Sequence, residues 1–455
     1  MNVKEFRVEK LFGAFDHKIS LNVEERITII HGENGLGKTI ILKMIKALYD
    51  ANLFELASYN FSKFIMILQS NEKLIIRKVI QDEEVTLIIQ KYSGRNKINE
   101  FKFDIDDESN VWRRKVIRKH YITKEIYPSD LEFELSHFLP IPIERIGSDR
   151  WLDPKRGRVY TTRELTKRFS DYLPRRFRTH LEIPDWFIEI TDNVQVSFIE
   201  TQRLLTRIKS EKSEYKSAVI EYSQHLAKTI KDMRAEATDL ASRLDRTYPN
   251  RLVKRMRETS NISEEDLTNQ LQRLEKKREL LNAVGLIDIE QEYIEPFYRS
   301  IKGQNENIVK DVLLVYVEDS NEKLEIYDDL TKRIKLLIDI VNKRFLYKKL
   351  KIDKEKGFVI QSTIEENKPI PLSGLSSGEQ HELVLFYQLL FVTKAESFLL
   401  LDEPEISLHI SWQDEFLNDL KEVIDLSNLT VLIATHSPDI IGNYWNLTTQ
   451  LKGIK

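Results

Sequence analysis

The chain has 455 residues, of which 41% are hydrophobic, and this is enough for two or three domains with a sizeable core. Its 70 Lys and Arg residues against 73 Asp and Glu residues give a net charge of −3, which excludes an overall basic field that would attract nucleic acid or an acidic membrane. The absence of Cys excludes disulfides, cysteine zinc sites and thiol nucleophiles, and it is compatible with the cytoplasmic location that we expect.

The sequence gives no sign of a membrane or secretory segment. The amino terminus, MNVKEFRVEKLFGAF, carries too many charges for a secretory signal. The most apolar later run, Leu383–Val392, is far shorter than the roughly 18 residues that span a bilayer. We therefore expect no targeting segment, no transmembrane helix and no membrane partner.

The first part of the chain alternates short strands and turns. Strands are predicted at Phe6–Leu11, Lys18–Leu21 and Ile27–His31, and a helix is predicted at Thr39–Asp50. Three further β-like runs, separated by turn residues, predict an antiparallel meander at Lys63–Gln69, Lys73–Ile80 and Glu84–Tyr92.

The segment from about Val111 to Arg178 is locally basic. Lys and Arg residues cluster at 113–119 and again at 156–178, and four aromatic residues are interleaved with them: Trp112, Trp151, Tyr160 and Phe177. Such a surface suits stacking on nucleic-acid bases, so DNA is a candidate ligand. Because Asp and Glu are mixed in, a solvated face without a ligand is the simpler alternative.

The middle of the chain, from about Thr201 to Tyr347, is rich in Lys, Glu, Arg, Leu and Ile at helical spacing. Its apolar positions keep heptad spacing for too few repeats to form a long rod. The expected structure is a compact helical hairpin or short coiled coil. Its predicted interruptions are Pro249, Gly285, Pro296 and Gly303.

The last hundred residues return to alternating strands and helices. The predicted elements are a strand at Phe358–Ser362, a helix from Ser377, a strand at Ser397–Leu401, a helix at Ser411–Val423 and a strand at Leu429–Ala434. The expected fold class is therefore α/β, with one core whose halves lie at the two ends of the chain. We predict an N-terminal half at 1–200 with the basic segment at about 111–180, a helical insertion at 201–350 and a C-terminal half at 351–455.

A glycine-rich motif follows the predicted strand Ile27–His31 and opens the next helix. Glycines let backbone N–H groups surround phosphate oxygens, Lys38 can reach the β- and γ-phosphates, and the Thr39 hydroxyl can ligate Mg²⁺. The motif therefore predicts that ATP and Mg²⁺ bind here, and a chance glycine-rich turn is the alternative. The residues that fit the phosphate-binding pattern G-x-x-x-x-G-K-[ST] are Gly32, Glu33, Asn34, Gly35, Leu36, Gly37, Lys38 and Thr39.

Two carboxylates close the apolar run Phe398–Leu401, as expected of a central parallel strand that presents acids at its carboxyl end. Asp402 would hold Mg²⁺, directly or through water, and Glu403 would act as the general base or orient the attacking water. Acidic pairs also begin many ordinary loops. This motif alone therefore leaves the two interpretations equally weighted.

Further motifs resemble those of ABC ATPases. Leu375–Gln380 is similar to the signature sequence of that family, and His436 follows in the family's order of motifs. The resemblance implies a two-subunit sandwich in which Ser376 and Gly378, with their neighbours Ser377 and Glu379, meet the ATP held by the opposite subunit. It also implies that His436 is a switch histidine at the γ-phosphate. From the residues alone, a helix cap at Ser376 or Ser377 and an ordinary loop histidine are the alternatives.

Two weaker assignments concern the surroundings of the nucleotide. Gln202 ends a strand-like run and resembles the Q-loop glutamine of the family, which would ligate Mg²⁺ and report the nucleotide state to the insertion. A packing or capping role for Gln202 is equally ordinary. Phe12 or Phe15 could stack on adenine, although a core position is the expected explanation for each.

The large insertion between Lys38 and Ser376 resembles the SMC and RecF-like branch of the ABC superfamily. More narrowly, the runs Leu240–Pro249, Leu375–Phe391 and Asp402–His409 resemble ATPases of bacterial anti-phage defence, first the AriA subunits of PARIS and next the PtuA subunits of Septu. This resemblance implies a homo-oligomer, from a sandwich dimer up to a hexamer. It also implies a phage trigger protein and a separate nuclease effector, of the TOPRIM-like AriB type or of the HNH type.

Too few residues follow His436 for a nuclease domain, so the effector is expected in another chain. The expected function is slow ATP hydrolysis that switches such an assembly. Two alternatives stay open: an SMC and RecF-like DNA-repair ATPase that binds DNA in an ATP-dependent way, and a scaffold that binds ATP without hydrolysing it.

Overall fold

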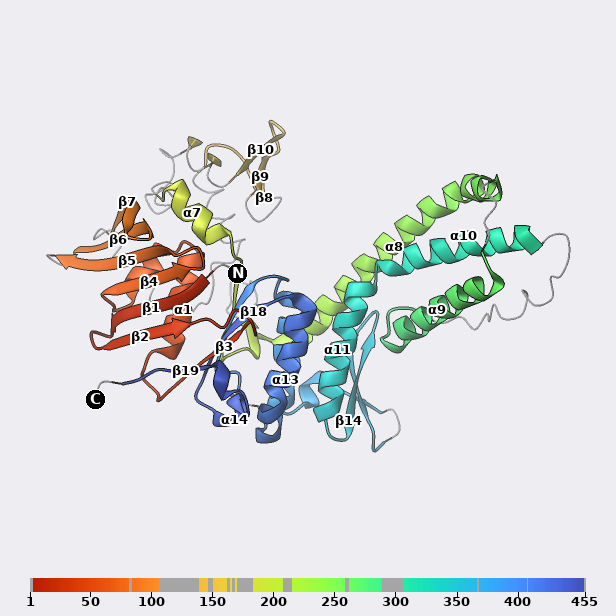
Figure 1. Ribbon diagram of the computed structural model, residues 1–455. Helices are drawn as coiled ribbons and strands as arrows, with labels where there is room; N and C mark the ends of the chain where they lie inside the picture. Colours follow the sequence, from red (N-terminus) through yellow and green to blue (C-terminus); the bar gives the residue numbers. More distant parts are fainter. Residues whose placement is uncertain are drawn as a thin grey trace.

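The computed structural model joins the two ends of the chain in one α/β body, from which a helical arm projects (Figure 1). The structure describes residues 3–81, 84–105, 139–145, 150–161, 164–165, 168–169, 183–207, 215–257, 262–288, 306–365, 368–406 and 408–453.

A five-stranded parallel sheet forms the centre of the body. β17 and β18 are buried almost throughout, as strands covered on both faces are. Alternate residues of β17 enter two different cores, Leu399 on one face of the sheet and Leu400 on the other. This sheet confirms the expected α/β fold class. Its order is β11 (Val196–Ile199), β17 (Phe398–Asp402), β18 (Thr430–Thr435), β3 (Ile27–His31) and β19 (Thr448–Gln450).

Helices cover both faces of this sheet. α1 (Lys38–Tyr49) packs on one face through apolar residues at helical spacing, such as Ile41 and Ile45. α13 (Ile410–Ser427) packs on the other face through Phe416 and Leu420. The short helix α14 (Pro438–Ile441) follows β18 and contacts α13. The loops that precede α1 and α14 therefore meet at the carboxyl edge of the parallel strands.

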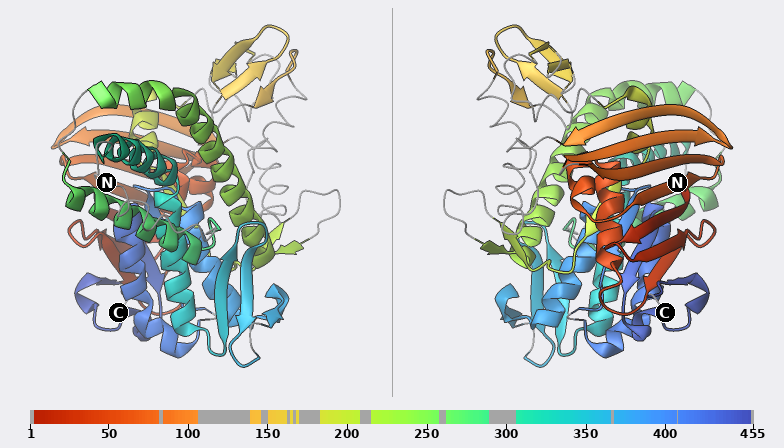
Figure 2. Two further views of the ribbon diagram at one scale, coloured as in Figure 1. Left: turned by 90° about the vertical axis from the view of Figure 1, so that its right-hand side faces the viewer. Right: turned by 90° about the vertical axis from the view of Figure 1, so that its left-hand side faces the viewer.

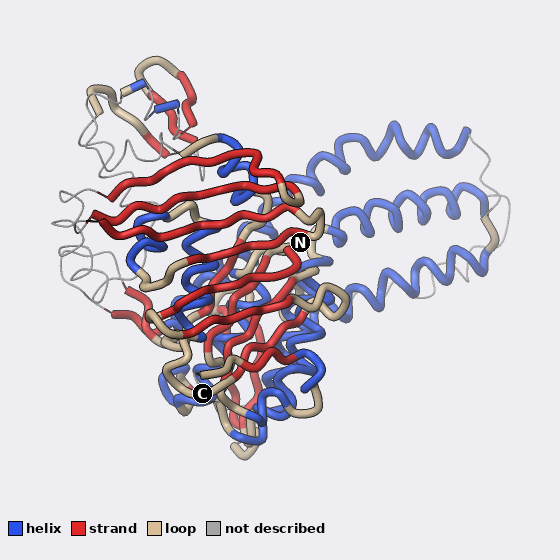
Figure 3. The backbone as a smooth tube through the Cα atoms, turned by 60° about the vertical axis from the view of Figure 1, so that its left-hand side comes forward, coloured by secondary structure: helices blue, strands red, loops and turns tan. Residues whose placement is uncertain are grey.

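A six-stranded antiparallel sheet lies beside α1 and α2 (Leu53–Ser58) (Figure 2, right, and Figure 3). The sequence pattern did not predict β7, because charged and polar residues interrupt the apolar alternation of this strand. β7 nevertheless pairs with β6 along its whole length. The strand order is β2 (Phe15–Ser20), β1 (Val3–Leu11), β4 (Lys63–Leu68), β5 (Glu72–Gln81), β6 (Glu84–Ser93) and β7 (Asn96–Ile105).

A small three-stranded sheet, β8 (Glu144–Arg145), β9 (Arg150–Asp153) and β10 (Arg158–Thr161), occupies part of the basic segment. Trp151 and Tyr160 are 0% and 2% exposed and pack in its core. The expectation that these two rings stack on nucleic-acid bases is therefore wrong, because their faces are used in folding. Trp112, Phe177 and the cluster at 113–119 lie outside the described residues.

The inserted helices form an arm rather than the compact domain that the short heptad runs predict. α8 (Ala218–Arg257) has 40 residues and pairs with α10 (Glu306–Glu325), which also packs on α9 (Glu264–Ala283) (Figure 1). α7 (Asp185–Asp192), β12 (Leu205–Arg207) and β13 (Tyr215–Ser217) precede α8. None of the helices in the described part of the chain is long and apolar enough to cross a membrane.

Pro249 does not interrupt α8, although proline usually breaks a helix interior. Arg251, two residues further on, donates from Nη2 to the carbonyl of Leu244, before the proline, at 2.9 Å. The same guanidinium pairs with the buried Asp319 of α10. These contacts hold the helix on both sides of the missing hydrogen bond.

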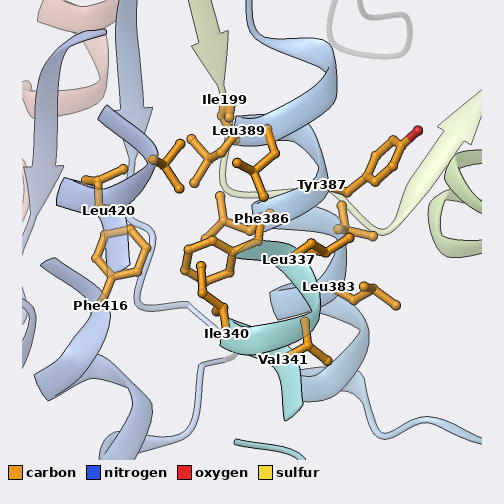
Figure 4. Packing of buried hydrophobic residues seen from close by; sticks show 14 of the residues in the cluster. Ile199, Leu337, Ile340, Val341, Leu383, Phe386, Tyr387, Leu389, Phe416 and Leu420 are labelled. Atoms are coloured by element: carbon orange, nitrogen blue, oxygen red, sulfur yellow. The ribbon is translucent and has the colours of Figure 1, made fainter. Parts of the chain in front are cut away.

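The last helix of the insertion, α11 (Asp328–Arg344), returns to the body and packs between α12 (Ser377–Tyr387) and α13 (Figure 4). Its final residue, Arg344, forms a buried ion triad with Glu382 of α12 and Asp419 of α13. Burial raises the pKa of Glu382 to about 7, although Arg344 opposes this shift. A three-stranded sheet, β14 (Lys348–Asp353), β15 (Gly357–Ser362) and β16 (Pro369–Ile370), connects α11 to α12.

Removing the cation of this triad should destabilise the body strongly. Arg344→Ala leaves two buried carboxylates without their shared partner, and we expect a loss of about 3–5 kcal/mol in the free energy of unfolding. Lys343→Ala is the matched control, because the neighbouring Lys343 forms an exposed pair with Glu415, and its loss should be about 0–1 kcal/mol. Urea denaturation measures both, and similar losses in the two variants would contradict the role given to the triad.

Candidate nucleotide site

The phosphate-binding motif lies between β3 and α1, and its backbone requires glycine. Gly35 and Gly37 both have φ +87°, and a Cβ on Gly37 would lie 2.4 Å from the Cδ2 atom of the buried Leu11. Lys38 Nζ donates to the carbonyls of Gly32 at 2.8 Å and Glu33 at 3.1 Å, so the loop curls around the ammonium group. Within the described residues, no side chain caps the first turn of α1. A curled loop before a free helix amino terminus is suited to phosphate.

Thr39 and Asp402 meet at the carboxyl edge of the sheet. The Thr39 hydroxyl donates to both carboxylate oxygens of Asp402, at 2.9 and 3.0 Å. Thr201, which the sequence analysis missed, donates to Asp402 Oδ2 at 3.3 Å. Burial raises the pKa of Asp402, and the hydrogen bond from Thr39 opposes that shift. Hydroxyl and carboxylate oxygens are the ligands that Mg²⁺ prefers beside nucleotide phosphates, so this pair fits the ion.

The structure brings Gln202 to the same edge. β11 and β17 are parallel neighbours, with Ile199 opposite Leu401, so Gln202 and Asp402 follow adjacent strand ends. Gln202 lies between Thr201 and Arg203, and both of these residues contact the segment from Asp402 to Ile406. Its proposed contact with Mg²⁺ stays a prediction.

Glu403 and His436 approach each other after β17 and β18. Glu403 leaves its strand with φ +43°, and its backbone N–H donates to the carbonyl of Ala434 at 2.8 Å. His436 Nδ1 lies 3.7 Å from Glu403 Oε1 and 3.1 Å from Glu405 Oε1. His436 also lines a cavity of about 420 Å³ together with Gly32, Glu33 and Asn34 of the phosphate loop.

The signature-like residues open α12. Ser376 caps this helix, and Glu379 completes the capping box by accepting from the Ser376 N–H at 2.7 Å. Burial would raise the pKa of Glu379, but the ion pair with Lys348 and the Ser376 N–H hold it below its ordinary value. Ser376 and Ser377 are exposed. The helix cap at Ser376, one of the alternatives that the sequence allowed, is therefore confirmed. The capped amino terminus of α12, beside Gly378, is exposed.

The cavity beside the phosphate loop and this helix amino terminus do not meet within one chain. In the described part of the chain, none of the four residues from Ser376 to Glu379 lines that cavity. The ion pair of Glu379 instead joins this helix to Lys348 of β14. The structure thus groups Lys38, Thr39, Asp402, Glu403 and His436, and it presents the signature segment separately.

Phe12 lies in the turn between β1 and β2, and Phe15 is the first residue of β2. Phe12 is 46% exposed with φ +56°, and a Cβ on Gly37 would lie 3.2 Å from its ring. The core position expected for Phe12 is therefore wrong, since this turn projects the ring beside the phosphate loop. Phe15 is partly buried and contacts Phe12 edge-on at 6.5 Å between ring centroids.

Comparison with known proteins gives the family. A family model described as "AAA ATPase domain" matches residues 1–441. The chain belongs to this family. ATP binding and ATPase activity are therefore the general function of this domain.

Further comparisons match a phage protein over a short stretch and solved SMC head domains over most of the chain. The chain is 41% identical over 69 residues to Protein ea59 of Escherichia phage lambda, a match that spans 15% of this chain and 13% of ea59. Among solved structures, the Smc head bound to the C-terminal domain of ScpA from Pyrococcus furiosus is similar at 12% identity and a TM-score of 0.34, covering 97% of this chain and 91% of that one. The SMC head of Thermotoga maritima is similar at 10% identity and a TM-score of 0.34, with 100% and 96% covered.

Two glycines of the phosphate loop should respond differently to alanine. Gly35 and Gly37 share φ +87°, but a Cβ on Gly35 meets open space, whereas one on Gly37 overlaps Leu11. Both variants carry the backbone strain, and Gly37→Ala should lose about 1–3 kcal/mol more in the free energy of unfolding. Urea denaturation without nucleotide measures this difference. Equal losses would mean that Leu11 does not constrain the loop.

Proposed function

We propose that this AAA ATPase domain works as an ABC-type, SMC and RecF-like ATPase that binds ATP with Mg²⁺ and hydrolyses it slowly. The observation that carries the proposal is the meeting of Thr39 with Asp402, next to the pair of Glu403 and His436. These residues come from three segments that meet at one sheet edge, the start of α1 and the chain at the ends of β17 and β18. Together they would supply the Mg²⁺ ligands, the general base and the phosphate-contacting group that phosphoryl transfer requires.

The roles follow from the atoms that each residue offers. Lys38 would exchange its bonds to the loop carbonyls for the β- and γ-phosphates. Thr39 and Asp402 would hold Mg²⁺, with Gln202 as a further oxygen ligand, and the ion would neutralise charge on the phosphates. Glu403 would orient or deprotonate the attacking water, and His436 would contact the γ-phosphate.

We propose that a second copy of the chain completes the site. The exposed amino terminus of α12, with Ser376, Ser377 and Gly378, is a ready anion site that its own phosphate loop does not use. A two-fold arrangement would place this helix end of each subunit against the ATP of the other. ATP would then hold the two bodies together, and hydrolysis would release them. Larger assemblies up to a hexamer could be built from such pairs.

The proposed biological role is sensor and scaffold in bacterial anti-phage defence. Its support is the resemblance of the runs around Ser376, Asp402 and Leu240 to AriA of PARIS and, next, to PtuA of Septu. In this role a phage protein would trigger the ATPase, which would hold or release a separate nuclease, TOPRIM-like or HNH. Co-purification from the native host tests this role, since the nuclease should elute with the ATPase.

One observation favours the DNA-repair alternative. Arg158, Arg168, Tyr160 and Glu164 line a hollow of about 300 Å³ on the small sheet, where both guanidinium groups lie over the Tyr160 ring. Two cations at one hollow could bind the DNA backbone. The alternative predicts ATP-dependent DNA binding that weakens steeply with salt and is lost in a variant with both Arg158→Glu and Arg168→Glu.

Two substitutions separate binding from hydrolysis. Lys38→Ala should abolish ATP binding, because the phosphate loop loses its only side-chain cation among the residues 32–39. Glu403→Gln should keep ATP bound, slow phosphate release about 100-fold or more and trap the associated form. Equilibrium dialysis, phosphate release and size-exclusion chromatography with ATP measure these effects. Glu422→Gln, on the exposed face of α13, is the control. Unchanged phosphate release in both variants would remove the enzymatic function.

A further inference from the structure

Glu405 is a buried carboxylate with no role in the site proposed above, which uses the phosphate loop, Asp402 and Glu403. It follows Glu403 by two positions, and its side chain is 5% exposed against 23% for Glu403. Glu405 is therefore more deeply buried than Glu403 and less accessible to a bound nucleotide. A buried carboxylate needs a defined set of partners, and those partners indicate what it does.

All described partners of the Glu405 carboxylate belong to the segment that carries His436. Glu405 Oε1 accepts from the Thr435 hydroxyl at 2.7 Å and from the backbone N–H of His436 at 2.9 Å. The same oxygen lies 3.1 Å from Nδ1 of the His436 ring. One carboxylate oxygen thus binds the main chain of this histidine and lies beside its ring.

Two carboxylates face the same nitrogen of His436, and this determines how the ring is presented. Nδ1 lies 3.1 Å from Glu405 and 3.7 Å from Glu403, and because both neighbours are acceptors, they favour a proton on this nitrogen over one on Nε2. Nε2 then lies at the opposite edge of the ring. His436 lines the cavity beside Gly32 and Asn34, so Nε2 is the ring nitrogen that remains for the nucleotide, and it donates to a phosphate oxygen only when it also carries a proton.

Arg203 supplies the charge that makes the burial of Glu405 tolerable. Arg203 is 4% exposed, and its Nη2 donates to the carbonyl of Pro404 at 3.0 Å and approaches that of Ile406 at 3.5 Å. The guanidinium therefore holds the backbone on both sides of Glu405. Burial lowers the pKa of Arg203 to about 10, against the attraction of Glu405 and Asp402, so Arg203 stays a cation at neutral pH.

We infer that Glu405 is a positioning residue for ATP hydrolysis, which acts by fixing the imidazole of His436 with Nδ1–H toward Glu405, so that Nε2, when it carries a second proton, donates to the γ-phosphate. This inference rests on the proposed ATPase function of the same site. Glu405 touches neither nucleotide nor water in this role, and its effect passes entirely through His436. The carboxylate of a Ser-His-Asp triad holds its histidine by the same physical means.

Kinetics of three variants test this role. Glu405→Gln keeps an oxygen for Thr435 and for the His436 backbone but removes the charge, and kcat should fall about 10- to 100-fold with KM for ATP within about threefold. The same change in a His436→Ala background should cause no further loss, because Glu405 acts through that ring. Glu415→Gln, an exposed partner of Lys343 on α13, is the control and should keep wild-type kcat. A fully active Glu405→Gln enzyme, or an additive loss in the double variant, would overturn the inference.

A spectroscopic measurement separates this inference from the ATPase proposal. In the full chain with ¹⁵N-labelled histidine, the His436 signal, assigned by its loss in His436→Gln, should show a proton on Nδ1, and Glu405→Leu should shift the proton population toward Nε2. This readout needs no turnover. If the wild-type chain hydrolyses no ATP, the ATPase proposal fails and the spectrum alone decides the inference. A wild-type ring protonated on Nε2 alone would refute it under either condition.

Discussion

The hydrogen bonds from Thr39 to Asp402 join residues 363 positions apart, and the rest of the architecture follows from that closure. β3 lies between β18 and β19, so the chain leaves the sheet after β3 and returns to it at β11 and again at β17. The antiparallel sheet, the small basic sheet and the helical arm are accordingly excursions from one edge or face of the body (Figure 1). Such long-range pairing carries a loop-closure cost that the buried strands and the two cores must offset.

The arm is attached to the candidate site through its return helix. α11 ends in Arg344, whose two carboxylate partners stand on α12, which opens with the signature segment, and on α13, which follows the acidic strand. Apolar residues of the same three helices pack against one another, among them Leu337, Phe386 and Phe416 (Figure 4). The packed helices are therefore one rigid unit, and a displacement of α11 cannot leave the amino terminus of α12 in place.

The sequence predicted those parts of the site that local chemistry determines. Glycines before Lys38, acids after a buried strand and a serine at a helix start each have a short-range signature, and the structure contains these local geometries. Glu405, Thr201 and Arg203 were missed because their meaning lies in contacts across the sheet edge, which no spacing reveals. The sequence offered one signal for Glu405. It is a further acidic residue, placed between Pro404 and Ile406 and two positions after Glu403.

The errors in the fold also have physical causes. Pro249 stays within α8 because Arg251 bridges the break with tertiary contacts, which outweigh a local propensity. The arm extends further than its weak heptads suggest because α8, α9 and α10 support one another by ion pairs such as Arg255 with Glu318. The sequence suggested that Trp151 and Tyr160 belong to an exposed aromatic surface, because basic residues dominate the segment around them. A sheet of three short strands, however, needs large buried rings for its core.

Complementation between two inactive variants tests the central claim most directly, namely that one ATP is held by the phosphate loop of one subunit and the signature helix of another. Ser376→Asp keeps a good helix cap but sets a negative charge against phosphate, and Lys38→Ala empties the loop of its cation. Each variant alone should be inactive. An equimolar mixture should regain about a quarter of the wild-type ATPase activity, because half of the dimers are mixed and each contains one intact site. A mixture as inactive as its components, or an active Ser376→Asp protein, would contradict the account.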